Sequence, residues 1–164
     1  MSKKRGFTLT ELLVVVVILG ILTAIALPQY RKAIQRAEAA DALVNLKTMF
    51  DAAKRYYSYH SNWPTTLKGL DVEFLDVNDN GKVGGFQYSL GQYSSDEDGL
   101  EGKYASACRI RTNSADNTYC LYAYYSLDDV RDVYTCISNH ERYNALCESM
   151  GKTTAADGGI QIGK

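Results

Sequence analysis

The sequence predicts an α+β fold, in which one long N-terminal helix packs against a small antiparallel β-sheet head. An apolar run at residues 7–27 is continued by a segment with helical periodicity to about residue 60. Short stretches rich in Tyr, Val, Ile and Leu, separated by polar turns, then occupy residues 85–138. The chain of 164 residues is long enough for one compact domain and one further element.

The first element begins with a leader, residues 1–6, that contains three consecutive cations. Cations before an apolar run favour a cytoplasmic position for that end of the chain. The run from Phe7 to Leu27 has 21 residues, which as a helix would extend about 32 Å, close to the ~30 Å of a bilayer core. A cleaved signal peptide is the alternative, but the run is too long and lacks a small-residue cleavage site. We therefore predict a transmembrane helix at residues 7–27.

Glu11 is the only ionisable residue between Phe7 and Leu27. A carboxylate in a membrane span costs several kcal/mol unless it is paired or lies near the interface. If the leader were removed after Gly6, Phe7 would carry a new α-amine. That amine, on the same subunit or on a neighbour, is the partner we expect for Glu11. The alternative is a glutamate that is satisfied inside the core of its own chain.

The N-terminal residues that carry these features resemble a known processing signal. The ten residues from Lys4, KRGFTLTELL, are similar to the class III signal of type IV prepilins and type II secretion pseudopilins. The residues LPQY around Pro28 look like the helix-kinking proline and following tyrosine of that family. The resemblance covers about residues 1–60 and implies a type IV pilin-like fold. Because Pro28 removes one backbone hydrogen bond, we also expect a kink or local melting there.

The resemblance further implies how the chain is processed and assembled. Prepilin peptidase would cleave after Gly6 and Phe7 would be N-methylated. The subunit would sit in the bacterial inner membrane as a single-pass protein in contact with lipid, with a cytoplasmic N-terminus and a periplasmic head. An inner-membrane assembly platform would then build a homopolymer, either an extracellular pilus or a periplasmic pseudopilus. Phe7, Glu11 and Pro28 would be the assembly residues, with Glu11 meeting the N-terminus of a neighbouring subunit.

Residues 28–60 are expected to be the amphipathic half of the same helix. Apolar side chains recur at spacings of three and four, which is typical of one helix face: Ala39, Leu43, Leu46, Phe50, Ala53 and Tyr57. This stripe must be buried against the head. The helix should end near Trp63, because Pro64 cannot continue it.

The head, residues 61–164, should begin with a loop that contains a short helical turn around Leu67 and Leu70. Four strands are then expected, joined by polar turns such as residues 112–117. They lie around residues 85–92, 103–111, 118–126 and 132–138. The tail from Gly151 is expected to pack as an irregular edge segment.

All four cysteines lie in the head and none has C-x-x-C spacing, so no zinc or thioredoxin-like motif is indicated. An exported head predicts two disulfides, whereas a cytoplasmic head predicts four thiols. In a hairpin centred on Ser114, Cys108 and Cys120 lie opposite each other, near disulfide distance. Cys136 and Cys147 flank ten residues that could loop back. Of the three possible pairings, we favour Cys108–Cys120 with Cys136–Cys147.

Asp76, Asn78 and Asn80, followed by Gly81, resemble the start of a calcium loop. Oxygens at alternate positions can converge on one hard cation. The twelfth position is Gln87 rather than the bidentate Glu that completes such a loop. We therefore favour a simple Asn-Gly turn and expect no cofactor, with calcium as the alternative.

The sequence contains no pattern that indicates an enzyme. It has two histidines, neither in H-E-x-x-H, and lacks G-x-S-x-G and phosphate-binding glycine loops. Residues 61–164 hold fifteen acidic and nine basic residues, which argues against direct binding of nucleic acid by the head. We predict a pilin, the structural subunit of a type IV pilus-like filament. The alternatives are a pseudopilin of a type II secretion system and a membrane-anchored binding head that does not polymerise.

Overall fold

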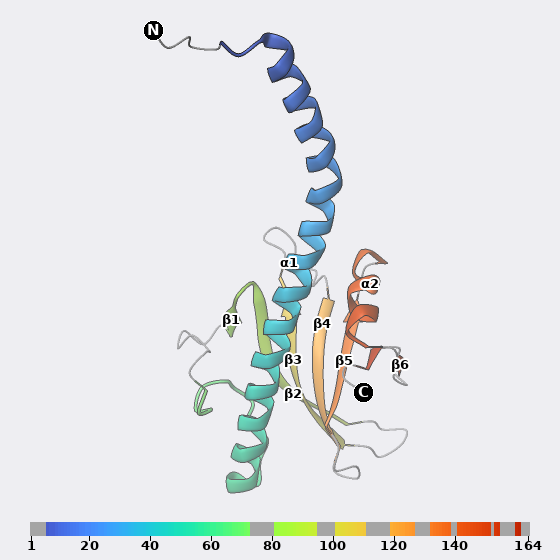
Figure 1. Ribbon diagram of the computed structural model, residues 1–164. Coiled ribbons are helices and arrows are strands. Elements are labelled where there is room, and N and C mark those ends of the chain that lie inside the picture. Colours follow the sequence, from blue (N-terminus) through green and yellow to red (C-terminus); the bar gives the residue numbers. More distant parts are fainter. Residues whose placement is uncertain are drawn as a thin grey trace. The chain divides into compact units, whose positions relative to one another are not determined.

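Figure 1 shows the computed structural model of the chain. By its internal contacts the chain divides into two units, residues 1–37 and 38–164. From here on, the stem is residues 1–37 and the head is residues 38–164, so that the head now includes the C-terminal part of the long helix as well as the residues 61–164 predicted above. The residues that the structure describes are 6–72, 81–94, 101–110, 119–126, 132–138, 141–151, 153–154 and 160–161.

Helix α1, Leu9–His60, has 52 residues and contributes to both units. The long N-terminal helix predicted to about residue 60 is therefore confirmed. We predicted a kink or local melting at Pro28. The helix continues through Pro28 without a break, which excludes local melting and leaves the kink as the alternative. At the other end, Ser61 takes a positive φ of 52° and its backbone N–H donates to the Tyr57 carbonyl at 2.8 Å.

The head contains a fully antiparallel sheet and a second helix, α2, Glu141–Met150. The strand order is β1-β2-β3-β4-β5-β7-β6. Four long strands match the four that we predicted, with shifted bounds. They are β2 (Phe86–Ser94), β3 (Glu101–Arg109), β4 (Tyr119–Ser126) and β5 (Val133–Ser138). Three two-residue strands complete the sheet: β1 (Lys82–Val83), β6 (Thr153–Thr154) and β7 (Ile160–Gln161). The α+β, pilin-like architecture is thus confirmed.

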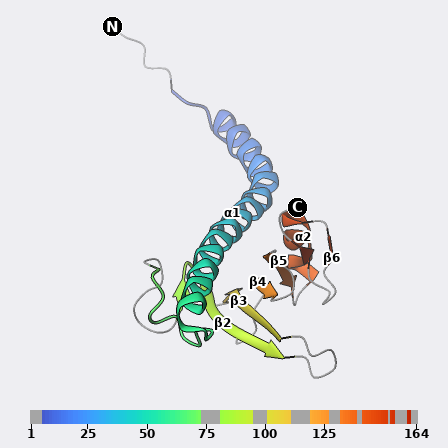
Figure 2. The same cartoon turned by 90° about the horizontal axis from the view of Figure 1, so that it is seen from below.

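Helix α2 and the short strands of the tail were not predicted from the sequence. The tail after Gly151 was expected to be an irregular edge segment, whereas β7 pairs with β5 and β6 pairs with β7. Two-residue strands have no periodicity to detect, because only their hydrogen-bonding partner defines them. Helix α2 lies beside β5 in both views (Figures 1 and 2). The predicted turn at residues 112–117 lies outside the described residues.

One face of α1 packs on one face of the sheet, where the helix crosses the strands in Figure 1. The predicted stripe is confirmed, because four of its residues are buried and the other two pack against the core. Ala42, Met49 and Ala52 widen the buried face. Opposite it, a row of cross-strand partners is buried in all four long strands: Tyr88, Ala107, Leu121 and Cys136. Large and small side chains alternate in this row, which lets the helix approach the sheet closely.

Aromatic rings close the far end of this core. Phe50 is fully buried and its ring makes edge contacts with Trp63 at 6.0 Å and Tyr134 at 6.4 Å between centroids. Trp63, just after the helix, is itself only 3% exposed. Trp63, near which we predicted the helix to end, therefore also brings the chain back to the core. Such aromatic contacts add about 0.5–1.5 kcal/mol each beyond area burial.

Two ion pairs tie α1 to the sheet side of the head. Lys54 Nζ lies 2.6 Å from Asp132 and 3.0 Å from Asp51. Burial of the ammonium group lowers the pKa of Lys54, but the hydrogen bonds to the two carboxylates outweigh it and raise the pKa overall. Arg109 of β3 lies 2.8 Å from Glu38 and its guanidinium carbon lies 5.2 Å from the centre of the Phe86 ring. The pairs Lys54–Asp132 and Arg109–Glu38 therefore connect α1 to the sheet region at two separate positions along the helix.

Two disulfides link neighbouring elements of the head. Cys108 of β3 and Cys120 of β4 face each other in the register and are bonded. Cys136 of β5 is bonded to Cys147 of α2. Both bonds follow the pairing that we favoured, and each closes a short loop, with separations of 12 and 11 residues. The second bond fixes α2 against the sheet.

Candidate functional site

The described part of the stem is apolar and almost entirely exposed. Every residue from Gly6 to Ile34 is exposed. Within the described residues, one helix is long and apolar enough to cross a membrane, and its most apolar 18-residue window has no buried residue. Soluble monomers rarely expose apolar patches above a few hundred Å², so a surface of this kind requires lipid or other subunits around it.

Thr8 and Glu11 form a reciprocal cap at the start of α1. The Thr8 backbone N–H donates to Glu11 Oε2 at 2.8 Å, and the Thr8 hydroxyl donates to the same oxygen at 2.7 Å. The Glu11 backbone N–H lies 3.3 Å from Thr8 Oγ1, which accepts from it. This arrangement is a capping box, which satisfies backbone donors that the first helical turn leaves free. The carboxylate also lies at the positive end of the helix dipole.

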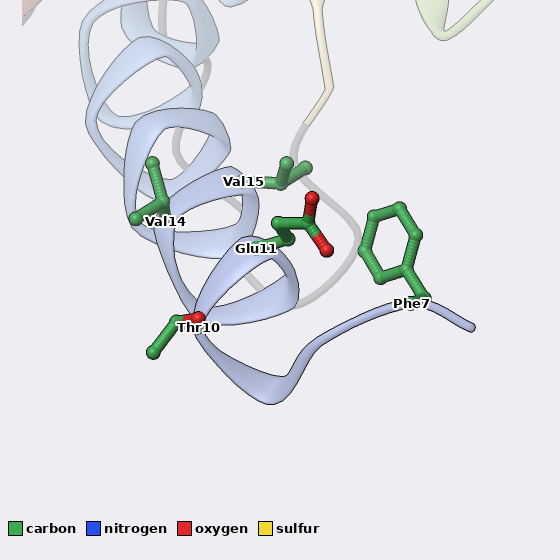
Figure 3. Close-up of a pocket in the computed structure, with 5 residues that line it drawn as sticks. All are labelled: Phe7, Thr10, Glu11, Val14 and Val15. Atoms are coloured by element: carbon green, nitrogen blue, oxygen red, sulfur yellow. The ribbon is translucent and has the colours of Figure 1, made fainter. Parts of the chain in front are cut away.

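Glu11 also lines an open groove with Phe7, Thr10, Val14 and Val15. In Figure 3 its carboxylate points toward the ring of Phe7 and lies beside Val15. Glu11 Oε1 has no hydrogen-bond partner in the described part of the chain, since both bonds from Thr8 reach Oε2. One carboxylate oxygen is therefore available to a donor from outside the chain.

The backbone around Gly6 is accessible. Residues 6–8 precede the helix and are not helical, and Gly6 and Phe7 are exposed. A Cβ added to Gly6 would meet nothing within 4 Å, so the fold itself does not require glycine there. A glycine in open, non-helical backbone is consistent with recognition by another protein, because an extended strand presents its backbone groups to a binding cleft.

The structure brings some of the predicted site residues together and leaves others apart. Phe7 and Glu11 line the same groove, whereas Pro28 lies farther along α1. Thr8 was missed, although the spacing Thr8-x-x-Glu11 is the sequence signature of a capping box. That signature is concealed here because the apolar run dominates the pattern of the segment.

The candidate calcium residues Asp76, Asn78 and Asn80 lie outside the described residues. Gly81, which follows them, is described: it has a positive φ of 57° and its carbonyl accepts a 2.7 Å hydrogen bond from the Tyr88 backbone. A Cβ at Gly81 would approach the Tyr88 carbonyl oxygen to 2.6 Å. The turn therefore requires glycine for backbone reasons alone. In the described residues no group of three His, Cys, Asp or Glu side chains is placed to hold a metal.

Comparisons with known proteins agree with the geometry of the stem. Residues 1–27 match the family model of the prokaryotic N-terminal methylation motif. The chain is 30% identical over 138 residues to the type IV major pilin protein PilE1 of Neisseria gonorrhoeae, which covers 77% of this chain and 81% of that protein. It is 31% identical over 128 residues to a fimbrial protein of Neisseria meningitidis serogroup A, which covers 71% and 72%.

A third relative shares mainly the N-terminal part. The type IV major pilin protein PilA of Myxococcus xanthus is 46% identical over 56 residues, which cover 34% of this chain and 26% of that protein. No solved structure matches the chain. The Neisseria relatives, in contrast, align with more than two thirds of both partners, and on this basis the chain belongs to the type IV pilin family.

Proposed function

We propose that the chain is made as a prepilin, cleaved after Gly6, methylated on the new N-terminal Phe7 and polymerised into a type IV pilus. The observation that carries this proposal is the Glu11 carboxylate at the start of an exposed apolar helix, because one of its two oxygens has no hydrogen-bond partner among the described residues. The relatives named as major pilins and as a fimbrial protein support it, as does the methylation motif at residues 1–27. The same relatives favour a pilin over a pseudopilin or a membrane-anchored binding head.

Glu11 supplies the chemistry of docking in this proposal. Cleavage after Gly6 creates an α-amine at Phe7, and the ammonium group of one subunit would bind Glu11 Oε1 of its neighbour. Two unit charges about 4 Å apart attract by ~1 kcal/mol in water and by ~4 kcal/mol at an effective dielectric constant of 20. Apolar helices alone can slide past one another, so this pairing would set the axial register of the bundle.

The cellular partners follow from the same steps. Prepilin peptidase would act on the open backbone at Gly6, on the cytoplasmic side of the inner membrane. The stem would lie in the bilayer as a single pass with the head in the periplasm, until an inner-membrane assembly platform moves it into the growing filament. Two disulfides in the head favour this exported location, because such bonds persist in oxidising compartments.

Filaments sheared from cells that express the chain would test the proposal. We expect long filaments in electron micrographs, whose subunit has a mass that corresponds to residues 7–164 with two disulfides and one methyl group. An N-terminus at Met1 would exclude processing. Membrane-bound chain without any filaments would favour the anchored head, and filaments only on overexpression would favour a pseudopilin.

A further inference from the structure

Three cations follow the apolar run closely: Arg31, Lys32 and Arg36. We call them the basic collar. They belong to the stem unit and all three are exposed. No Asp or Glu occurs between residues 12 and 37, so the stem offers them no carboxylate on the same stretch of helix.

The collar also has no ion pair in the described part of the chain. The ion pairs found there involve Lys54, Arg55 and Arg109. The first acidic residue after the collar is Glu38, and Arg109 already occupies it at 2.8 Å. Lys32 and Arg36 stand four residues apart on one helix, a spacing at which like charges repel each other. An anion from outside the chain would relieve this repulsion.

The position of the collar along α1 matches one layer of a bilayer. At about 1.5 Å per residue, Arg31 and Lys32 lie ~6–8 Å beyond Leu27, the end of the apolar run. The headgroup region on each side of the hydrocarbon core is ~5–8 Å deep. Arg36 lies ~13 Å beyond Leu27, but helical side chains lean toward the N-terminus and arginine is long enough to reach back.

Tyr30 supplies a second indication of an interface. It is 65% exposed, directly before the collar, and tyrosine is enriched at the level of lipid headgroups. The collar residues also cover an arc of about 140° around the helix, at 100° per residue. A single neighbouring helix contacts a narrower stripe, whereas a headgroup layer surrounds the helix and reaches all three cations.

We propose that the basic collar binds the phosphates of anionic phospholipids on the outer surface of the membrane in which the stem resides before assembly. This inference rests on the proposed membrane stage and adds to it a lipid class and three binding residues. The collar would hold the subunit at a defined depth, with Glu11 near the opposite surface. Each surface cation is worth up to about a fivefold preference for an anionic surface at moderate ionic strength.

Spin-labelled lipids would test the proposal with the full mature chain, residues 7–164, reconstituted into phosphatidylcholine vesicles. Electron paramagnetic resonance measures how strongly labelled phosphatidylglycerol is favoured over labelled phosphatidylcholine in the lipid shell of the protein. We expect a preference of several-fold for phosphatidylglycerol that declines as salt is raised. In the variant R31Q/K32Q/R36Q the preference should fall to near one.

A matched variant controls for net charge. K47Q/K68Q/K82Q removes three exposed lysines of the head, which have no ion pair among the described residues, and should leave the lipid preference unchanged. If the collar variant keeps its preference, or the control loses it equally, the inference is wrong. The same holds if the collar variant behaves normally with lipid but fails to form filaments, since its cations would then contact other subunits. A chain that does not insert into vesicles at all would contradict the proposed function itself.

Discussion

Apolar side chains are exposed in the N-terminal part of α1 and buried on one face of its C-terminal part. From Gly6 to Ile34 every residue is exposed, whereas Leu46, Met49 and Phe50 are completely buried against the sheet. One helix therefore has a C-terminal part with a buried face and an N-terminal part whose residues are exposed. The head therefore buries its own apolar core, while the stem requires lipid or further subunits around it.

Charged groups show the same contrast. In the head, Lys54 has two carboxylates within 3.0 Å. In the stem, the Glu11 carboxylate accepts hydrogen bonds from Thr8 at one of its two oxygens, and the other oxygen has no partner among the described residues. Changes in the stem should therefore affect assembly without unfolding the head, and changes in the head core should do the reverse.

The largest expected effect on assembly follows from Glu11→Ala. Loss of the carboxylate would remove the proposed contact between subunits, worth up to ~4 kcal/mol, so we expect the yield of surface filaments to fall at least about tenfold. Membrane insertion should persist, because an uncharged span inserts more easily. Quantification of sheared filaments against total membrane-bound chain would measure both.

Glu11→Gln tests whether the charge of Glu11 or its hydrogen bonds are needed for assembly. The amide oxygen can still accept hydrogen bonds from Thr8, but the charge is gone. Filaments should remain scarce in this variant if pairing with an ammonium group matters. Filaments at the wild-type yield in either variant would show that Glu11 has no role in docking.

The next effect concerns the core of the head. Phe50→Ala should lower the free energy of unfolding of the head by about 3–5 kcal/mol, because it leaves a cavity between Trp63 and Tyr134. Val44→Ala, at a residue of the same helix that is 64% exposed, should change it by less than about 0.5 kcal/mol. Chemical denaturation of the full chain in detergent, followed by tryptophan fluorescence, would measure both. Equal losses would contradict the observed burial.

Removal of one disulfide should have a somewhat smaller effect. For C108S/C120S the loop of 12 residues predicts a loss of about 2.8 kcal/mol in the chain-entropy model. The stem should insert into membranes as before. Thiol labelling of the denatured, unreduced native chain should find no free cysteine, and four reactive thiols would contradict export of the head.

The smallest effect is expected for the cap of the helix. Thr8→Val keeps the shape of the side chain but removes the hydroxyl that Glu11 Oε2 accepts from, at a cost of about 1 kcal/mol to the first turn. Amide exchange at residues 9–12 in detergent micelles should accelerate, while exchange in the head stays the same. Thr8→Ser keeps a hydroxyl and should restore protection, and a failure to do so would argue against the capping box.

Several features of the protein could be predicted from local patterns. The apolar run is continuous in the sequence, so local composition alone indicates the exposed apolar helix of the stem. The register that joins Cys108 to Cys120 also follows from local spacing, because a short hairpin leaves few alternatives. The helical stripe from Ala39 to Tyr57 was visible for the same reason, since its periodicity depends only on helix geometry.

Other features depended on contacts between distant residues, and only the tertiary structure decided them. Lys54 meets Asp132 across 78 positions, and Arg109 of β3 meets Glu38 of α1. The short strand β7 is defined by its pairing with β5, and β6 by its pairing with β7. Such contacts leave no periodic trace, because neither partner needs a particular neighbour in the sequence. The apolar stem is the opposite case: its own residues specify the helix, and residues 6–34 are exposed in the structure.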